Sequence, residues 1–241
     1  AEHGASTMRC AFHVDYEIPL PEGHPFPMKK FSALRRILLE EDILREETLM
    51  SPEEAPWTEI ALAHDHDYLE RLKHGRLGSA EERRLGLPWS PALVRRSRLA
   101  VGGTMLAAWQ SLEDGVSGNL AGGTHHAHPE AASGYCLLND IGVAAHQALE
   151  DGVKRVLIVD LDVHQGDGTA LIFADEPRVF TLSLHAESNF PARKQQSDLD
   201  VPLPRGMGDA DYLAVLERTL TEVLTRVRPQ LVIFDAGVDP H

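Results

Sequence analysis

The sequence predicts an α/β protein, a three-layer α/β/α sandwich built around a mainly parallel sheet. Short runs of β-branched and aliphatic residues alternate with longer segments in which apolar residues recur at helical spacing. Such alternation is typical of right-handed βαβ units, which place helices on both faces of a parallel sheet. The run Val156–Val159 is wholly aliphatic, as expected of a strand that is buried on both faces.

Each element follows from its local sequence. Further strands are expected over residues 9–13, 119–123, 178–185 and 230–237. Apolar periodicity predicts helices over 28–41, within 52–74, over 92–112, 139–151 and 210–226, and a short one that ends at 174. The proline-rich segment 19–27 and the segment 186–204 are expected to be irregular, and the polar segment 75–91 to form a surface loop over a site.

The composition is that of a globular cytoplasmic protein. The chain has 241 residues and no apolar run of membrane-spanning length. Its two cysteines form no disulfide framework, which fits a reducing cytoplasm. A formal net charge of −14 disfavours nucleic acid as a partner and favours a cationic substrate. We expect one domain over 8–241, with an expression remnant at 1–7; the sequence leaves the oligomeric state open.

The expected site is organised around the segment 156–169. Its apolar run ends in Asp160, Asp162 and His164, which are two residues apart and therefore point to one side of a strand. Turn-forming residues follow, so this polar set lies at the carboxyl end of the strand, where open α/β sheets bind ligands. Carboxylate and imidazole ligands suit Zn²⁺, with Asp162 and His164 as the first candidates. The alternative is a solvated strand end followed by a capped helix.

Two other expected strand ends carry residues of the same kind. His125 and His126 follow the glycines that end the 119–123 strand, and Asp239 follows the 230–237 strand. Paired histidines in a loop are often solvent-exposed residues that have no functional role. Here three strand ends would bring ligand-type residues to one cleft, which indicates a metal site.

Four segments together resemble the zinc-dependent histone deacetylase family, which includes acetoin-utilisation proteins and acetylpolyamine amidohydrolases and has the arginase/deacetylase fold. The segments are Gly122–His126, Gly134–Cys136 with Asn139-Asp140, Asp160–Gly168 and Ala236–Asp239. The resemblance runs from about Met8 to His241 in the family's motif order. The pair His164-Gln165 and the run His24-Pro-Phe26 are similar to the class IV branch.

The resemblance implies the central chemistry of the site. Asp162, His164 and Asp239 match the zinc ligands, which leave one position open for water and the substrate carbonyl. His126 matches the general base and acid, and Asp167 matches the carboxylate that orients it. The implied reaction is hydrolysis of the amide bond of an acetylated or acylated lysine peptide or of an acetylpolyamine.

The resemblance also implies the surroundings of this centre. His125, paired with Asp160, matches a neighbour of the general base that acts electrostatically. Gly134 and Tyr135, with Phe190 opposite, match a narrow tunnel for the acyl-lysine stem. A candidate potassium (K⁺) site would use Asp160, Asp162, His164, Ser183 and Leu184.

The chain departs from the family's pattern in two places. The family's oxyanion-stabilising tyrosine follows a Gly-Gly turn well beyond the third ligand, whereas this chain ends two residues past Asp239. Its four tyrosines, Tyr16, Tyr68, Tyr135 and Tyr212, lie in other contexts. We therefore expect a fragment that lacks the C-terminal part of the fold, binds metal poorly and turns over slowly. The family's substrate-gripping aspartate has no match near Leu87–Ser90.

Two other functions remain open. An arginase-type ureohydrolase with two Mn²⁺ ions shares the fold, but it needs an Asp-Ala-His-x-Asp run and an Asp-x-Asp-x-x-Asp-Pro run, which this sequence does not contain. A non-catalytic module that binds acyl-lysine or polyamine is compatible with the missing tyrosine.

Overall fold

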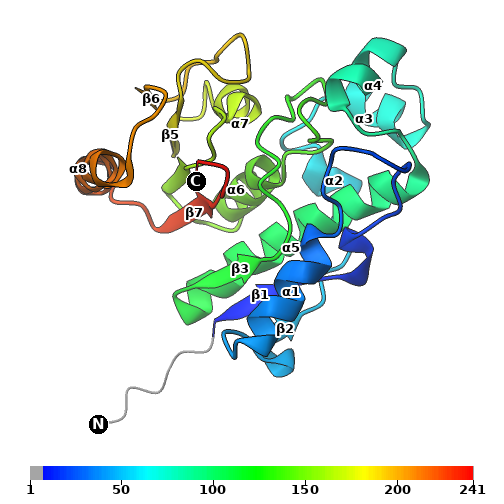
Figure 1. The fold of residues 1–241 in the computed structure, drawn as a ribbon, viewed down its shortest axis with the longest axis horizontal. Coiled ribbons are helices and arrows are strands. Elements are labelled where there is room, and N and C mark those ends of the chain that lie inside the picture. Colours follow the sequence, from blue (N-terminus) through cyan, green and yellow to red (C-terminus); the bar gives the residue numbers. More distant parts are fainter. Residues whose placement is uncertain (1–7, 241) are drawn as a thin grey trace.

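The computed structural model describes residues 8–240, so the expected expression remnant at 1–7 lies outside the described residues, as does His241. Within this range the strands form two sheets, and every strand pair is parallel (Figure 1). The smaller sheet has the order β2 (Leu49–Met50), β1 (Arg9–Ala11), β3 (Ser117–Asn119). The larger sheet has the order β6 (Leu199–Leu203), β5 (Val179–Ala186), β4 (Val156–Asp160), β7 (Leu231–Asp235).

The larger sheet is covered on both faces. Val156 and Ile158 of β4 pack in one apolar cluster with α6 (Asp140–Glu150). Leu157 and Val159 pack in another with α8 (Asp209–Val227), and Figure 1 shows α6 and α8 on opposite sides of the strands. Successive side chains of a strand point to opposite faces, so an unbroken aliphatic run serves both layers. The predicted three-layer α/β/α sandwich is confirmed.

Of the remaining helices, all but α7 lie in the N-terminal half of the chain. They are α1 (Lys30–Glu40), α2 (Trp57–Ile60), α3 (His66–Lys73), α4 (Ser79–Leu85), α5 (Pro91–Asp114) and α7 (Asp167–Ile172), with short 3₁₀ turns at Val14–Tyr16 and Glu46–Thr48. The hydroxyl of Ser90 accepts a hydrogen bond from the backbone N–H of Leu93 at 3.0 Å, which caps α5. This long helix packs against α6 and against β3 of the smaller sheet.

Three local predictions were wrong. The expected loop over 75–91 contains α4, the region 186–204 contains β6, and the strand expected over 119–123 lies at Ser117–Asn119. The region 52–74 is helical as expected, with two short helices, α2 and α3. Helix α4 has a polar sequence in which Leu85 is the buried residue. Its first turn is held by Glu81, whose carboxylate accepts the backbone N–H of Gly78 at 2.8 Å. Helix α4 is thus stabilised by its N-terminal cap, and its sequence lacks the apolar stripe from which a helix is predicted.

The parallel strands of the larger sheet bring their carboxyl ends to one edge. Asp160, the last residue of β4, pairs in register with Ser183 of β5 and with Asp235 of β7. The segments that follow β4 and β7 therefore start side by side, and this edge carries the candidate site. Within residues 8–240 no helix combines the length and the apolar character needed to cross a bilayer.

His64 fixes the loop that connects β3 to α6. Its side chain is buried, Nδ1 lies 3.0 Å from the carbonyl oxygen of His128, and Nε2 accepts the backbone N–H of Asn139 at 2.9 Å. These partners require a neutral ring that carries its proton on Nδ1.

We expect His64 to make stability depend on pH. Burial lowers the pKa of His64 to about 4, so between pH 6.5 and about 4 the unfolded chain takes up a proton that the folded chain does not. This contribution to stability is present above pH 6.5 and is lost as the pH falls toward 4, by up to about 3 kcal/mol. Urea unfolding of His64→Gln across this range should show a correspondingly smaller dependence on pH. The exposed residue His66 gives the control His66→Gln; equal slopes for wild type and His64→Gln would contradict the prediction.

Candidate active site

Asp162, His164 and Asp239 form a cluster at the carboxyl edge of the larger sheet. Nδ1 of His164 lies 2.8 Å from Oδ1 of Asp162 and 3.2 Å from Oδ2 of Asp239. The ligand-type atoms of all three residues lie within 4.8 Å of one another. The backbone N–H groups of His164 and Val163 donate to Asp162 at 2.7 Å and to Asp239 at 3.0 Å, so main chain holds both carboxylates.

The cluster fits a divalent metal ion. Two ligand atoms that each lie about 2.0 Å from a tetrahedral ion are roughly 3.3 Å apart, close to the His164–Asp239 separation. The side chain of Asp239 is 42% exposed, so the cluster opens to solvent. Burial opposes ionisation of Asp162, but the hydrogen bond from His164 prevails and lowers the pKa of Asp162 to about 2. The same hydrogen bond raises the pKa of His164, so an ion that binds here must displace a proton.

A second group, fully buried, adjoins the cluster. Nδ1 of His125 lies 2.6 Å from Oδ2 of Asp160 and 3.4 Å from Oδ2 of Asp235. Burial alone would lower the pKa of His125, but the Asp160 carboxylate outweighs it and raises that pKa to about 10. Burial, with the Asp160 charge added, raises the pKa of Asp235 well above its usual range. His125 is therefore a cation at neutral pH, and the buried carboxyl of Asp235 favours its neutral form more than an ordinary aspartate does.

Asp235 was missed by sequence reasoning. Its Oδ2 is the buried side-chain oxygen that lacks a hydrogen-bond partner among residues 8–240. The available signal was its position, because it ends an apolar strand as Asp160 does, and the two residues are paired in register.

His126 lies between the two groups. Its ring centroid is 4.1 Å from that of His125 and 5.8 Å from that of His164. Its Nδ1 lies 2.7 Å from Oδ1 of Asp167, the first residue of α7. Burial and the His125 charge lower the pKa of His126 despite the Asp167 carboxylate. Nδ1 is engaged by Asp167, so Nε2 is the nitrogen that remains for proton transfer.

Two of the three expected tunnel residues, Gly134 and Phe190, adjoin His126, and Tyr135 follows Gly134 in the chain. The ring of Phe190 meets that of His126 edge-on, with centroids 4.9 Å apart. A Cβ on Gly134 would lie 2.6 Å from Cδ2 of His126, and the φ of Gly134 is +52°, so this position requires glycine. Tyr135 packs beside Phe26, with ring centroids 5.2 Å apart. Phe190 and Tyr135 are 43% and 39% exposed, so these aromatic walls open to solvent.

The backbone of two glycines packs closely against the carboxylate residues Asp160 and Asp162. A Cβ on Gly237 would lie 2.6 Å from the Cβ of Asp162, and a Cβ on Gly166 would collide with Oδ2 of Asp160. These two glycines therefore pack their backbone directly against the residues that carry the charge.

Comparison with known proteins identifies the family. A family model described as the histone deacetylase domain matches residues 24–241, which is most of the chain. The chain belongs to the histone deacetylase family.

Individual members of the histone deacetylase family and related proteins extend this result. An uncharacterized protein of Picosynechococcus is 49% identical over 231 residues, with 95% of this chain and 77% of that protein covered. The acetoin utilization protein AcuC of Staphylococcus aureus is 31% identical; the match covers 91% of this chain and 62% of AcuC. The crystal structure of an HDAC homolog complexed with SAHA is 29% identical, with a TM-score of 0.81, and covers 94% of this chain and 67% of that one. The expected arginase/deacetylase fold is thereby confirmed.

Gln165 ties the end of β4 to the loop that carries Phe190 in this histone deacetylase domain. Its side-chain N–H group donates to the carbonyl oxygen of Gln195 and to Asp200, each at 2.7 Å, and its Oε1 accepts the backbone N–H of Gln195 at 2.8 Å. Sequence reasoning used Gln165 only as a mark of the class IV branch. Three partly buried hydrogen bonds give Gln165 a structural role.

We expect Gln165→Leu to loosen this loop. The substitution keeps most of the volume but leaves the polar groups of Gln195 and Asp200 without their partner, which should lower the free energy of unfolding by about 2–4 kcal/mol. Backbone amides over 187–198 should exchange faster with solvent. The exposed neighbour Gln196 provides the control Gln196→Leu; if both variants exchange at the wild-type rate, Gln165 does not anchor the loop.

The other residues of the candidate potassium site lie on β5. Ser183 is the register partner of Asp160, and its Oγ is 3.0 Å from Nδ1 of His185. Leu184 packs in the apolar cluster beside α8. Potassium binding stays a prediction.

The tyrosines serve other purposes. The hydroxyl groups of Tyr16 and Tyr68, both buried, donate to Asn119 at 2.9 Å and to the carbonyl oxygen of Leu137 at 2.6 Å. Tyr135 packs beside Phe26, and Tyr212 lies on α8. In none of these positions does the tyrosine match the oxyanion-stabilising residue of the family.

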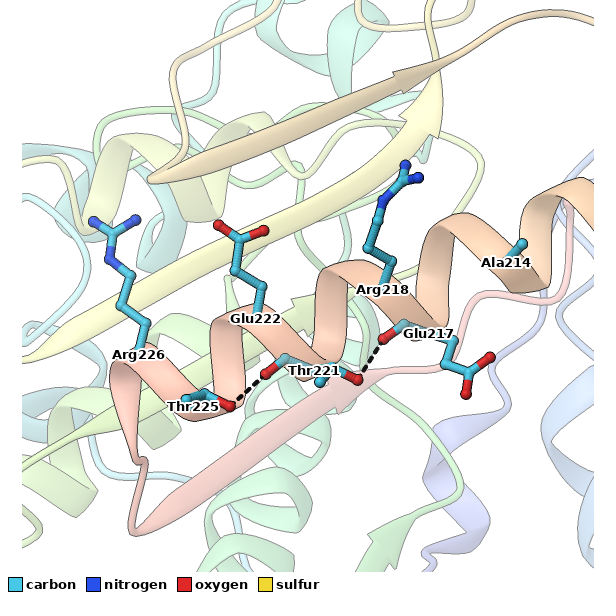
Figure 2. A pocket seen from close by; sticks show the side chains of 7 residues that line it. All are labelled: Ala214, Glu217, Arg218, Thr221, Glu222, Thr225 and Arg226. Atoms are coloured by element: carbon cyan, nitrogen blue, oxygen red, sulfur yellow. Dashed lines mark hydrogen bonds between the residues drawn. The ribbon is translucent and has the colours of Figure 1, made fainter.

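A surface hollow of about 760 Å³ on α8 is separate from this site. Figure 2 shows that its lining side chains all come from α8, from Ala214 to Arg226. The hydroxyls of Thr221 and Thr225 donate to backbone carbonyls one turn earlier, at 2.8 and 2.7 Å. The hollow is the outer surface of one helix and contains none of the residues that form the histidine and aspartate groups.

Proposed function

We propose that this chain is a zinc-dependent amidohydrolase, which removes an acetyl or other acyl group from a lysine-type amine. The proposal is carried by one observation: the Asp162–His164–Asp239 cluster lies beside the His126–Asp167 pair, with the rings of His126 and His164 5.8 Å apart. Metal-assisted amide hydrolysis needs a cluster that can hold Zn²⁺ and a neutral base next to it.

Zn²⁺ bound by Asp162, His164 and Asp239 would supply a Lewis acid that polarises the acyl carbonyl and lowers the pKa of water. His126 is neutral near pH 7, because burial lowers its pKa. It accepts a proton from the attacking water through Nε2 and then donates a proton to the amine nitrogen as the amide bond breaks. Asp167 holds the ring with Nδ1 protonated, and acetate and a free amine are the products.

His125 acts electrostatically in this scheme. The Asp160 carboxylate keeps the buried ring protonated, with its pKa at about 10. A fixed positive charge at this depth stabilises the negative charge that develops on the carbonyl oxygen.

The proposed substrates are acetyl-lysine or acyl-lysine peptides and acetylpolyamines. Aromatic walls from Phe190 and Tyr135 suit the aliphatic stem of such an amine, and the net charge of −14 attracts cationic molecules. Both cysteines are free and buried, which fits action in the cytoplasm by a single catalytic domain over 8–241.

The test is turnover by the Zn²⁺-loaded chain of three substrates: an acetyl-lysine peptide, a long-acyl-lysine peptide and acetylputrescine. Release of a free amine is expected for at least one of them, and a chelator should abolish it. Saturable binding without release would instead favour the non-catalytic binding module. Release that continues at full rate after complete removal of metal would contradict the proposal.

A further inference from the structure

Two imidazoles share the carboxylate of Asp167. Nδ1 of His126 lies 2.7 Å from Oδ1, and Nε2 of His128 lies 2.7 Å from Oδ2. Among residues 8–240, these two histidines are the side chains that donate hydrogen bonds to the Asp167 carboxylate. Asp167 is buried, whereas the side chain of His128 is 18% exposed, so His128 stands on the solvent side of the pair.

We propose that His128 is a positioning residue, which holds Oδ2 of Asp167 so that Oδ1 of the same carboxylate faces His126. A carboxylate held through one oxygen can turn about its broad terminal torsion, whereas donors on both oxygens fix its plane. Its effect on turnover rests on the proposed amide hydrolysis, while its effect on the ring of His126 does not.

The backbone of His128 is itself fixed. Its N–H group donates to the carbonyl oxygen of Ala131 at 2.8 Å, and its carbonyl oxygen accepts Nδ1–H of the buried ring of His64 at 3.0 Å. His64 is held in turn by the N–H group of Asn139. The His128 ring therefore projects from a rigid base, which a positioning role requires.

The electrostatics of Asp167 agree with this arrangement. Burial opposes its ionisation, but the hydrogen bonds from His126 and then His128 prevail and lower the pKa of Asp167 to about 2. A buried carboxylate with one donor would carry an incompletely satisfied charge. The second imidazole keeps Asp167 anionic and stationary.

The experiment compares His128→Gln with His128→Asn. The amide nitrogen of glutamine reaches about as far as Nε2 of histidine, whereas that of asparagine falls one methylene short. Both substituted side chains are small and polar, so the variants differ mainly in how far the amide nitrogen reaches. Thermal melting checks that the two variants are equally stable. His66→Asn is the surface control.

Two readouts are needed. Nitrogen NMR of the metal-free protein with ¹⁵N-labelled histidine should show His126 with its proton on Nδ1 in wild type and His128→Gln, and mixed tautomers or broadening in His128→Asn. With the Zn²⁺-loaded protein and an acetyl-lysine peptide, kcat should fall about 10- to 100-fold in His128→Asn with little change in KM, and recover in His128→Gln. Wild-type NMR signals for His126 in His128→Asn, or equal behaviour of the two variants, would overturn the proposal. If wild type hydrolyses no amide, the proposed function fails and the NMR comparison still decides the role of His128.

Discussion

Asp239→Asn should weaken Zn²⁺ binding more than any other single change outside the segment 160–164, which carries the other two proposed ligands. The substitution keeps the shape of the side chain but removes the charge from one of three ligands, so the dissociation constant should rise by more than the roughly 10- to 100-fold typical of changes to outer partners of a metal site. Turnover should fall in proportion to the metal that is lost. Metal content after dialysis against a chelator of known affinity measures the effect directly.

The control for this experiment is Asp211→Asn, which removes the same charge from the exposed surface of α8. Affinity should also fall as the pH is lowered, because the raised pKa of His164 means that the ion competes with a proton. Retention of one tightly held equivalent of Zn²⁺ by Asp239→Asn would remove Asp239 from the ligand set.

His126→Ala should separate chemistry from metal binding. Loss of the general base and acid should lower kcat by about 10²- to 10⁴-fold while the Zn²⁺ content stays at the wild-type level. In wild type, activity should be lost as the pH falls through the lowered pKa of His126, because protonation removes the base. Asp167→Asn removes a carboxylate that raises this pKa, so the acidic limb of the pH profile should move to still lower pH. A His126→Ala variant with undiminished kcat would require another base.

The fold was predictable because its elements leave strong local patterns. The aliphatic run of β4 predicts a buried strand, and Asp160 marks its polar end. The prediction that Asp162 and His164 continue one side of that strand was wrong, because the strand ends at Asp160 and both residues lie in the segment that follows it. The length of α5 follows from Ser90 and Pro91 at its start and Gly115 at its end. Helix α4 was missed because its stability comes from a polar cap and not from an apolar face.

The site was predictable only in outline. Family motifs named His126 and Asp167, but Asp235, Gln165 and His128 acquire their roles through contacts made after folding. Asp235 joins the site because β7 places it beside Asp160, where its buried Oδ2 has no hydrogen-bond partner among the described residues. Gln165 matters because a loop 30 residues away folds back onto it. Such contacts depend on three-dimensional approach, for which spacing along the chain gives no signal.

The glycines at the base of the site limit how its chemistry can change. Gly134, Gly166 and Gly237 leave no space for even one methyl group beside His126, Asp160 and Asp162. Random variation there is expected to destroy the protein before it alters selectivity. We therefore expect new substrate preferences to arise more readily at Tyr135 and Phe190, whose side chains are partly exposed to solvent.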